Sequence, residues 1–386
     1  MLTRSQVKEI EKIRQTLHKY PELSGDEPET ASLIKSFLER FGADEIIERV
    51  GGYGLIGIYN GTGSSDDGEH LMLRAELDAL AINERSGVPY ESQNGGKMHA
   101  CGHDGHMAVL LGVAKWLNHN RPRRGRVYLV FQPAEESGEG ADAMMSDPAF
   151  QELRIDRAIA LHNLPGYKKN VVFIRNGTFA SASVGLKVSF RGQSSHAAFP
   201  REGVNPSESI AKLVQGLEKI KSRLLEKIHF RVLTITYIKV GEPAFGINPG
   251  NGELGVTIRA ETDKGMEEIY KEVTALIESI ATAFEGEVST EQKEPFAATV
   301  NDEDGVDEVL KIAGSAGYDV QKLDDPFAWS EDFGEFRKGF PITLFGLGAG
   351  ENTPPLHSEE YDFEDELIPA GTALFCERIK LMKGYE

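Results

Sequence analysis

The chain has 386 residues, with 42 Lys and Arg against 61 Asp and Glu, so its net charge is −19 at pH 7. This charge argues against nucleic acid and anionic membranes as partners, and no apolar run approaches the ~20 residues of a membrane-spanning helix. The N-terminus has no apolar signal core and two cysteines do not make a disulfide framework, so we expect a cytoplasmic protein of two domains.

The first part of the chain is expected to alternate helices with buried strands. Residues 2–41 carry apolar positions at helical spacing, with a break near Pro21, and residues 107–117 form a later helix. Short apolar strands are predicted at 54–59, 71–75, 126–131, 155–161 and 342–347. This alternation is typical of an α/β fold whose largely parallel sheet is covered by helices on both faces.

Chemically active residues follow several of these strands. Glu76 and Asp78 follow the second predicted strand, Glu135 and Glu136 follow the third, and His162 follows the fourth. Ligands of such sheets bind outside the carboxyl ends of the strands. The sequence therefore predicts one site at this edge of the sheet, and Asp78 is assigned to its catalytic residues.

The middle of the chain has a different pattern. Strands are predicted at 184–190, 230–240, 255–261 and 287–292, and helices at 206–225 and 265–284. Their order is β-α-β-β-α-β, which is a ferredoxin-like unit. We expect an inserted second domain, residues 183–293, within a discontinuous first domain of residues 1–182 and 294–386.

The densest chemical motif lies at residues 99–106, where three histidines, one thiol and one carboxylate occur together. Cys101 and His103 are two positions apart, so both can face one ion. A thiolate and a neutral imidazole are usual ligands of zinc and similar divalent metals. The alternative is a polar loop with ordinary surface histidines.

Three further residues complete a candidate two-metal ligand set with Cys101 and His103. Taken singly, Glu136 has a simpler interpretation as a solvated acid, His162 as a core histidine and His357 as a loop histidine. One metal site accounts for all of them together. We therefore predict that the chain binds two divalent metal ions.

The adjacent carboxylates of Glu135 and Glu136 can do different work. One binds metal, while the other accepts a proton from a metal-bound water, whose pKa falls to about 7. The alternative is an acidic turn, because Glu139 and Asp142 are close in the sequence.

Three other motifs leave their roles open or point to structure. His196, within residues 193–200, is either a donor to a developing oxyanion or part of a surface turn. The glycines at 346–350 are not followed by a helix, so they do not complete a dinucleotide-binding loop. Residues 331–333 are expected to cap and pack a helix.

Taken together, these residues resemble a known enzyme family. The chain is similar to the dinuclear-metal aminoacylases and carboxypeptidases, and most similar to their amidohydrolase branch of N-acyl-amino-acid, hippurate and plant auxin-conjugate hydrolases. The resemblance spans essentially the whole chain in the right order. It rests on the motifs at 74–80, 99–106, 132–136, 161–162, 195–198, 299–302, 330–333 and 356–358.

The resemblance implies a catalytic α/β domain with two metals and an inserted lid that often mediates dimerisation. It implies that the metal ligands are Cys101, His103, Glu136, His162 and His357. It also implies that Glu135 is the general base, that His196 stabilises the oxyanion in its own or a neighbouring subunit, and that Asn248 helps to hold the substrate carboxylate. Mn or Zn are the expected metals, and Co and Ni also suit such ligands.

The sequence departs from the family pattern at a few positions. Glu76 stands where the family usually has Asp, Gln193 to Ser195 where glycine and basic residues are common, and Ser183 where Asp is frequent. None of these is an implied ligand or the base, so they bear on substrate choice more than on the reaction.

The expected function is metal-dependent hydrolysis of the amide bond of an N-acyl amino acid, in a homodimer or larger homo-oligomer. One alternative is a dipeptidase or carboxypeptidase that uses the same metal site. A second alternative is a non-catalytic metal-binding or ligand-binding module, which would leave Glu135 without a role.

Overall fold

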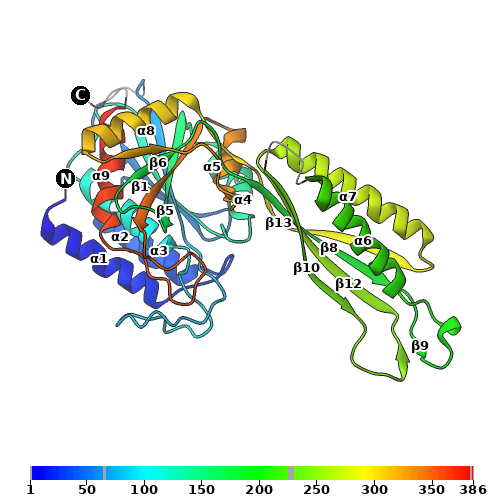
Figure 1. The fold of residues 1–386 in the computed structure, drawn as a ribbon. Helices are drawn as coiled ribbons and strands as arrows, with labels where there is room; N and C mark the ends of the chain where they lie inside the picture. The colour runs from blue at the N-terminus through cyan, green and yellow to red at the C-terminus, as the bar shows by residue number, and fades with distance from the viewer. Residues whose placement is uncertain (1, 64–66, 225–229, 383–384, 386) are drawn as a thin grey trace. The chain divides into compact units, whose positions relative to one another are not determined.

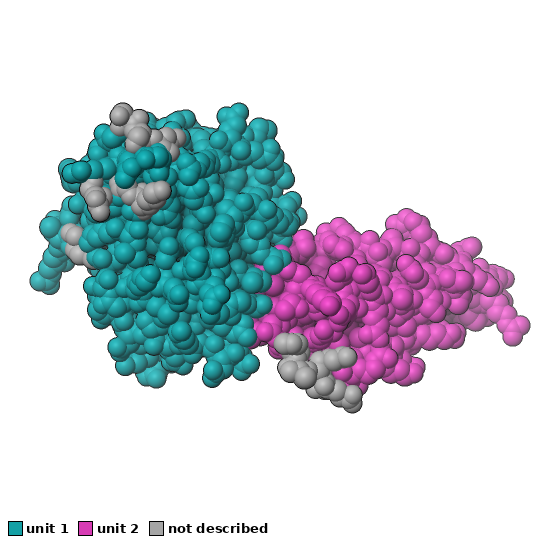
Figure 2. All heavy atoms as spheres, turned by 90° about the horizontal axis from the view of Figure 1, so that it is seen from above, with its two compact units in different colours: residues 1–179, 299–325, 332–386 teal, residues 180–298, 326–331 magenta. Residues whose placement is uncertain are grey.

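The computed structural model describes residues 2–63, 67–224, 230–382 and 385 (Figure 1). The chain forms two compact units, which Figure 2 shows in different colours. The first unit contains residues 1–179, 299–325 and 332–386, and the second contains residues 180–298 and 326–331. The chain therefore leaves the first unit, builds the second and returns.

An eight-stranded sheet forms the centre of the first unit. In sheet order its strands are β1 (Glu45–Val50), β2 (Gly54–Asn60), β4 (Arg126–Gln132), β3 (His70–Glu76), β5 (Arg157–Pro165), β16 (Ile342–Gly350), β6 (Val172–Ile174) and β15 (Val320–Lys322). The central strands β4, β3, β5 and β16 are parallel neighbours. Strands β1, β2 and β4 pair antiparallel, as do β6 and β16. The predicted, largely parallel sheet is confirmed at its centre.

Helices cover both faces of this sheet, as the alternation predicted. One layer shares a continuous hydrophobic core with the sheet and consists of α1 (Arg4–Lys19), α2 (Pro28–Arg40), α3 (His103–Leu117), α8 (Glu303–Ala316) and α9 (Leu367–Lys380). The layer on the other face consists of α4 (Gly140–Ser146), α5 (Pro148–Gln151) and the 3-10 helix η2 (Asp332–Lys338). A short two-stranded sheet pairs β7 (Gly177–Ala180) with β14 (Thr299–Asn301).

The prediction for the end of β5 was wrong. The polar pair His162 and Asn163 was expected to follow the strand, but β5 continues through both to Pro165. The reason is that β16 also extends past Leu347 to Gly350 and supplies backbone partners along this length. Glycine in this part of β16 gives a neighbouring side chain the space that it needs. A Cβ on Gly346 would lie only 2.2 Å from a side-chain carbon of Leu164.

The second unit has the predicted β-α-β-β-α-β order. Its strands are β8 (Ala182–Arg191), β10 (Arg231–Val240), β12 (Asn251–Ala260) and β13 (Glu287–Phe296), and its helices are α6 (Ser207–Leu224) and α7 (Asp263–Ala283). The antiparallel sheet has the order β10-β12-β8-β13, which is ferredoxin-like. Of the predicted helix 206–225, residue 225 lies outside the described residues.

The second unit has its own hydrophobic core. Both helices are amphipathic, and their apolar stripes pack on the same face of the sheet. On β8 the buried side chains alternate with more exposed ones, as expected for a sheet with one covered face. A short pair, β9 (Ser195–His196) and β11 (Ile247–Asn248), and the 3-10 helix η1 (Pro200–Glu202) complete this unit.

No helix in the described ranges is both long enough and apolar enough to cross a membrane.

A buried charge network ties α1 to α3 in the first unit. Asp104, at the start of α3, accepts hydrogen bonds from Arg14 (3.3 Å) and His18 (2.8 Å) of α1. Burial opposes the ionisation of both histidine and carboxylate, but the pairing outweighs it. The pairing raises the pKa of His18 to about 10 and holds the pKa of Asp104 well below its usual range. Asp104 is therefore the charged anchor of this helix pair.

We expect Asp104→Asn to lower the free energy of unfolding by about 3 kcal/mol, because it leaves the buried His18 and Arg14 with one carboxylate fewer. Urea denaturation of the purified variant measures this. The matched control is Arg85→Ala, which breaks an exposed ion pair with Glu359 and should change stability little. Equal effects of the two substitutions would contradict the assignment.

Candidate metal centre

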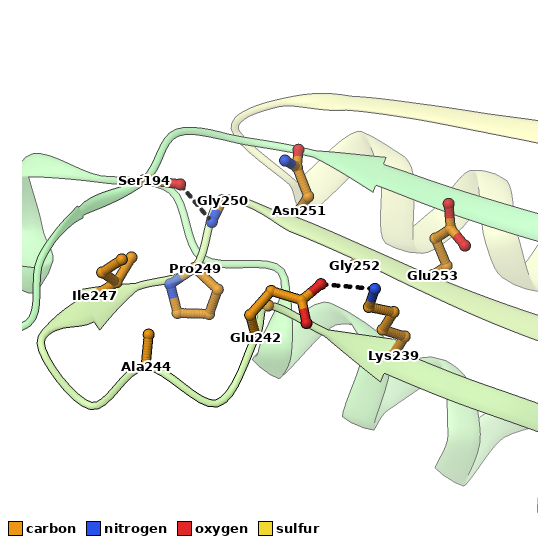
Figure 3. A pocket seen from close by; sticks show the side chains of 11 residues that line it. Ser194, Lys239, Glu242, Ala244, Ile247, Pro249, Gly250, Asn251, Gly252 and Glu253 are labelled. Carbon is orange, nitrogen blue, oxygen red and sulfur yellow. Dashed lines mark hydrogen bonds and ion pairs between the residues drawn. The ribbon is translucent and has the colours of Figure 1, made fainter.

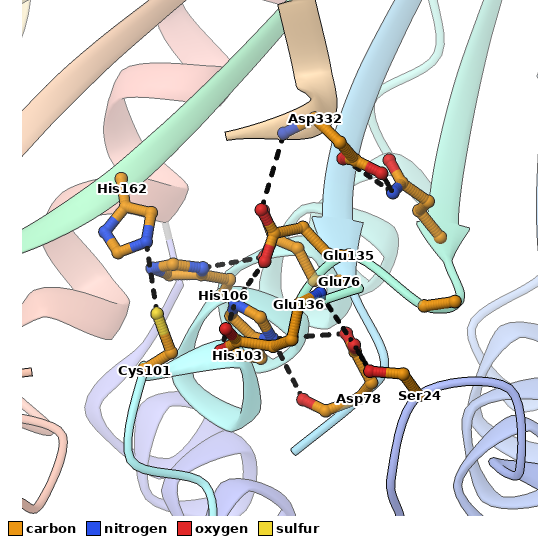
Figure 4. Close-up of polar contacts among 12 residues, drawn as sticks. Ser24, Glu76, Asp78, Cys101, His103, His106, Glu135, Glu136, His162 and Asp332 are labelled. Atoms are coloured by element: carbon orange, nitrogen blue, oxygen red, sulfur yellow. Dashed lines mark hydrogen bonds and ion pairs between the residues drawn. The ribbon is translucent and has the colours of Figure 1, made fainter. Parts of the chain in front are cut away.

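Several histidine, cysteine and carboxylate side chains converge at the carboxyl edge of the central sheet, and Figure 4 shows Cys101, His103, Glu135, Glu136 and His162 among them. Three of the five three-residue groups whose potential ligand atoms lie within 4.8 Å of one another are Cys101–His103–His162, Cys101–Glu136–His357 and His103–Glu135–Glu136; the other two are Glu76–His103–His106 and Glu135–Glu331–Asp332. All five predicted metal ligands and Glu135 belong to these groups. Cys101 is shared by the first two groups, so its thiolate lies where it can contact two ions.

The backbone turn before α3 brings Cys101 and His103 to this edge. Gly102 between them adopts φ 92° and ψ 14°, a left-handed conformation that favours glycine. A Cβ on Gly102 would lie 2.5 Å from Asn163 Oδ1 and 2.7 Å from the Tyr361 hydroxyl. Glycine is thus favoured at position 102 for two reasons: the left-handed backbone conformation and the lack of room for a Cβ.

The hydrogen bonds of two histidines leave the same ring atom facing the site. His103 Nδ1 donates to the Asp78 carbonyl (2.9 Å), and His162 Nδ1 donates to the Asn163 carbonyl (2.8 Å). In the neutral ring, which a metal ligand must be, each Nε2 is then the unprotonated nitrogen. His103 Nε2 is buried without a hydrogen bond among the described residues, and His162 Nε2 lies 3.6 Å from Cys101 Sγ. This is the tautomer that a metal ligand requires.

The loop after β4 carries the two adjacent carboxylates. Ala134 has φ 52°, an uncommon value for a residue with a Cβ, and its N–H donates to buried Glu27 (3.0 Å). Glu135 Oε2 and Glu136 Oε1 lie 3.7 Å and 3.9 Å from His103 Nε2. The strained turn therefore points both carboxylates at one imidazole.

The electrostatics of this edge favour a cation. Burial disfavours a charged His103, yet the hydrogen bond to Asp78 and the charges of Glu76 and Glu136 raise its pKa to about 10. Burial likewise disfavours a charged Asp78, but hydrogen bonds from His103 and Ser24 hold its pKa below the ordinary value. The pocket thus stabilises positive charge, and two cations with this set of S, N and O donors fit its chemistry.

His357 reaches the group from the loop after β16. It has φ 64°, and its N–H donates to the Ala100 carbonyl (2.9 Å). Its Nε2 lies 3.8 Å from Glu136 Oε2, and 53% of its side chain is exposed. Burial and the charge of His103 lower its pKa, which favours the neutral imidazole that binds metal.

The other two predicted residues lie in the second unit. His196 and Asn248 occupy the paired short strands β9 and β11, where Asn248 is opposite Ser195. His196 Nδ1 accepts a hydrogen bond from the Ala198 N–H (3.0 Å), so the ring proton is on Nε2. Asn248 Nδ2 donates to Ser195 Oγ (3.0 Å).

A cavity of about 400 Å³ lies beside β11 (Figure 3). Its wall includes Ile247 and Pro249, which flank Asn248 in the sequence, and the ion pair of Lys239 with Glu242. Most polar side chains on this wall are exposed, and they do not point toward one common centre in Figure 3 as the labelled side chains of Figure 4 do.

The sequence analysis missed several residues that support the site. Asp332 was expected to cap and pack a helix, but its carboxylate is fully buried and accepts hydrogen bonds from Arg74 (2.7 Å), Gln132 and Ala141. Its N–H also donates to Glu135 Oε1 (3.4 Å). His106 and Asn163 were not assigned roles either. The sequence offered only their positions as a signal, since His106 lies in the motif at 99–106 and Asn163 follows the predicted ligand His162.

The geometry agrees with comparisons to known proteins. Residues 72–380 match the sequence model of peptidase family M20/M25/M40. The chain belongs to this family. It is 32% identical to a hippurate hydrolase of Campylobacter jejuni, over 95% of each chain. It is also 32% identical to an N-acetyl-L-cysteine deacetylase of Bacillus subtilis, over 98% of this chain and 89% of that one.

Solved structures show the same fold as this member of the M20/M25/M40 family. A structure from methicillin-resistant Staphylococcus aureus superposes with a TM-score of 0.82 at 27% identity, covering 97% of this chain and 95% of that one. A Bacillus subtilis protein described as a dinuclear metal binding peptidase has a TM-score of 0.80 at 23% identity, covering 98% of each chain. The fold predicted from the sequence is thereby confirmed.

We expect Gly102→Ala to destabilise the protein by about 2 kcal/mol or more, because the added Cβ meets both a left-handed backbone and the atoms of Asn163 and Tyr361. The matched control is Gly317→Ala. Gly317 also has a left-handed φ of 79°, but a Cβ there meets no atom within 4 Å. Urea denaturation of both variants separates the steric effect from the backbone effect. Equal losses would show that the crowding is unimportant.

Proposed function

We propose that this chain is a dinuclear metal-dependent amidohydrolase that cleaves N-acyl amino acids to a carboxylate and a free amino acid. The observation that carries the proposal is the convergence of Cys101, His103, Glu136, His162 and His357 with Glu135 directly beside them. The names of the relatives support this substrate class, since one is a hippurate hydrolase and another an N-acetyl-L-cysteine deacetylase.

Two divalent cations would be held by these five ligands, with Cys101 common to both groups. When bound, such cations acidify a water molecule to near neutral pH and polarise a carbonyl group. Mn or Zn are the expected ions, and Co and Ni also suit the donors. The thiolate required of Cys101 fits a reducing compartment, and we infer a cytoplasmic location. Cys101 and Cys376 are both buried and reduced.

Glu135 is the proposed general base. Its side chain is 7% exposed, and Oε2 is 3.7 Å from Nε2 of the proposed ligand His103. A carboxylate here accepts a proton from the attacking water and later delivers it to the leaving amine nitrogen. The hydrogen bond from the Asp332 N–H to Oε1 orients it, and Asp78 orients His103 and Glu136 through its carbonyl and carboxylate.

The second unit is proposed to recognise the substrate. The Nε2 proton of exposed His196 is available to donate to the oxyanion of the tetrahedral intermediate. Asn248 is proposed to bind the substrate carboxylate, and Asn205 Nδ2 donates to its Oδ1 (2.7 Å), which fixes the amide. We further propose that the predicted domain 183–293 serves as a lid on the catalytic domain formed by 1–182 and 294–386.

The same unit is the proposed surface for homodimerisation. Strand β10 is at an edge of its sheet, with Tyr237 and Ile238 each about half exposed, and Phe245 in the following turn is fully exposed. An unpaired edge strand flanked by exposed apolar side chains is a typical site for association with another chain.

The substrate class is tested with protein reconstituted with Mn²⁺ or Zn²⁺. Amino-acid release is measured from N-acetyl-, N-benzoyl- and N-succinyl-amino acids and from dipeptides. We expect release from one N-acyl class, abolished by a chelator and restored by added metal. Release from dipeptides alone would favour the dipeptidase alternative, and no release with two metals bound would contradict the proposed function.

We expect Glu135→Gln to bind two metals as the wild type does but to lose about 10²–10⁴-fold in kcat, because the amide cannot accept the proton. Metal content is measured by mass spectrometry and turnover by amino-acid release. The control is Glu139→Gln, which removes an exposed carboxylate from the same loop. Near wild-type turnover in the Glu135 variant would remove Glu135 from the role of base.

A further inference from the structure

A chain of buried polar side chains lies behind the candidate ligand His162. Glu76 Oε2 accepts a hydrogen bond from His106 Nδ1 (2.7 Å), and its other oxygen pairs with Arg74. His106 Nε2 lies 2.7 Å from Asn163 Oδ1 and 3.1 Å from the Asn163 backbone nitrogen. Asn163 Nδ2 in turn donates to the Tyr361 hydroxyl (2.6 Å). The chain thus crosses from β3 through α3 to β5 and the loop that carries His357.

This network is part of the protein interior, because every one of its residues is at most 2% exposed. Buried polar groups of this kind are costly unless each is satisfied. A satisfied network fixes the relative position of the elements that it joins, here the last residue of β3, the first turn of α3 and the interior of β5.

The end of this network holds His162. The Asn163 carbonyl accepts the Nδ1 proton of His162, which leaves Nε2 facing Cys101. The rings of His106 and His162 also pack edge to face, with centroids 4.8 Å apart. Asn163, whose carbonyl orients the His162 ring, is therefore anchored by the same histidine that contacts the ring.

His162 has a different anchor from Glu136 and His357, the two ligands that belong only to the second group, whereas Asp78 holds both His103 and Glu136. Glu136 is held by a hydrogen bond from its N–H to Asp78, and His357 by one from its N–H to the Ala100 carbonyl. Neither of these hydrogen bonds involves Glu76, His106 or Asn163. Substitutions in the buried network should therefore act on one of the two metals.

We propose that Glu76, His106 and Asn163 are positioning residues for His162, and that they set the affinity of the metal bound by Cys101, His103 and His162. This inference rests on the ligand set of the proposed function. Glu76 reaches both Arg74 and His106 with its two carboxylate oxygens, which gives this side chain a role that its place in the sequence motif did not reveal.

The test uses Glu76→Gln and Asn163→Leu in the full chain. Glu76→Gln keeps the shape but removes the charge, and Asn163→Leu keeps the approximate volume but removes the side-chain hydrogen bonds. Two metal affinities are measured by competition with a chelator, followed by mass spectrometry of the retained metal. With Co²⁺, the thiolate-to-metal absorption of Cys101 is a second readout. Thermal melting verifies that each variant is folded.

We expect one metal to bind about 10–100-fold more weakly in both variants while the other keeps its affinity. The Co²⁺ absorption should shift, because the geometry at the shared thiolate changes. The control is Tyr128→Phe, which removes a buried hydroxyl in contact with His70 (3.1 Å) on the same sheet. It should leave both metal affinities unchanged.

Wild-type affinity for both metals in the two variants would overturn the inference, as would an equal loss at both sites. If one variant does not fold, the other decides by the same criteria. If neither folds, the two metal affinities are measured in His106→Asn, which replaces the imidazole with a smaller polar side chain, and the same criteria apply. A wild-type protein that binds fewer than two metals would instead overturn the proposed function.

Discussion

The structure depends on the concentration of negative charge at the carboxyl edge of the central sheet. Glu76, Asp78 and Glu135 are almost completely buried there, close to Glu136. Buried charges are tolerated only when they are paired and hydrogen-bonded, and an unpaired one costs several kcal/mol. Part of the compensation is built into the protein, as in the pairing of Glu76 with Arg74 and His106. The carboxylates that face His103 remain the natural partners of added cations.

The sheet topology explains how residues so far apart in the sequence meet. Strands β3, β4 and β5 are parallel neighbours, so the segments after β3 and β4 leave from the same edge. Helix α3 begins at this edge and is buried nearly all round, which fixes Cys101 and His103 relative to the sheet. A parallel sheet under two helical layers is rigid, and metal ligands require such rigidity because their distances tolerate little change.

Much of this arrangement could be predicted from the sequence, because strand ends and dense motifs carry local signals. The apolar runs gave β2, β3, β4 and β16, and the order of elements gave the ferredoxin-like unit. The extension of β5 through His162 could not be predicted, since polar residues normally mark a strand end and only the partner strand β16 explains it. The roles of Asp332, His106 and Asn163 depend on contacts across 30 to 258 residues of sequence, which no local pattern reports.

The proposed division of roles between the two units follows from the same physics. Metal ligands and a base need a buried, tightly hydrogen-bonded environment, and the first unit supplies it with Asp78 and Asp332 as the central acceptors. His196 is exposed in the second unit, and its donor proton is fixed only by a local turn. A group that recognises different acyl amino acids can change without disturbing buried charge. Under the proposed function, substitutions in the second unit would therefore alter substrate choice without disturbing the buried charges of the first unit.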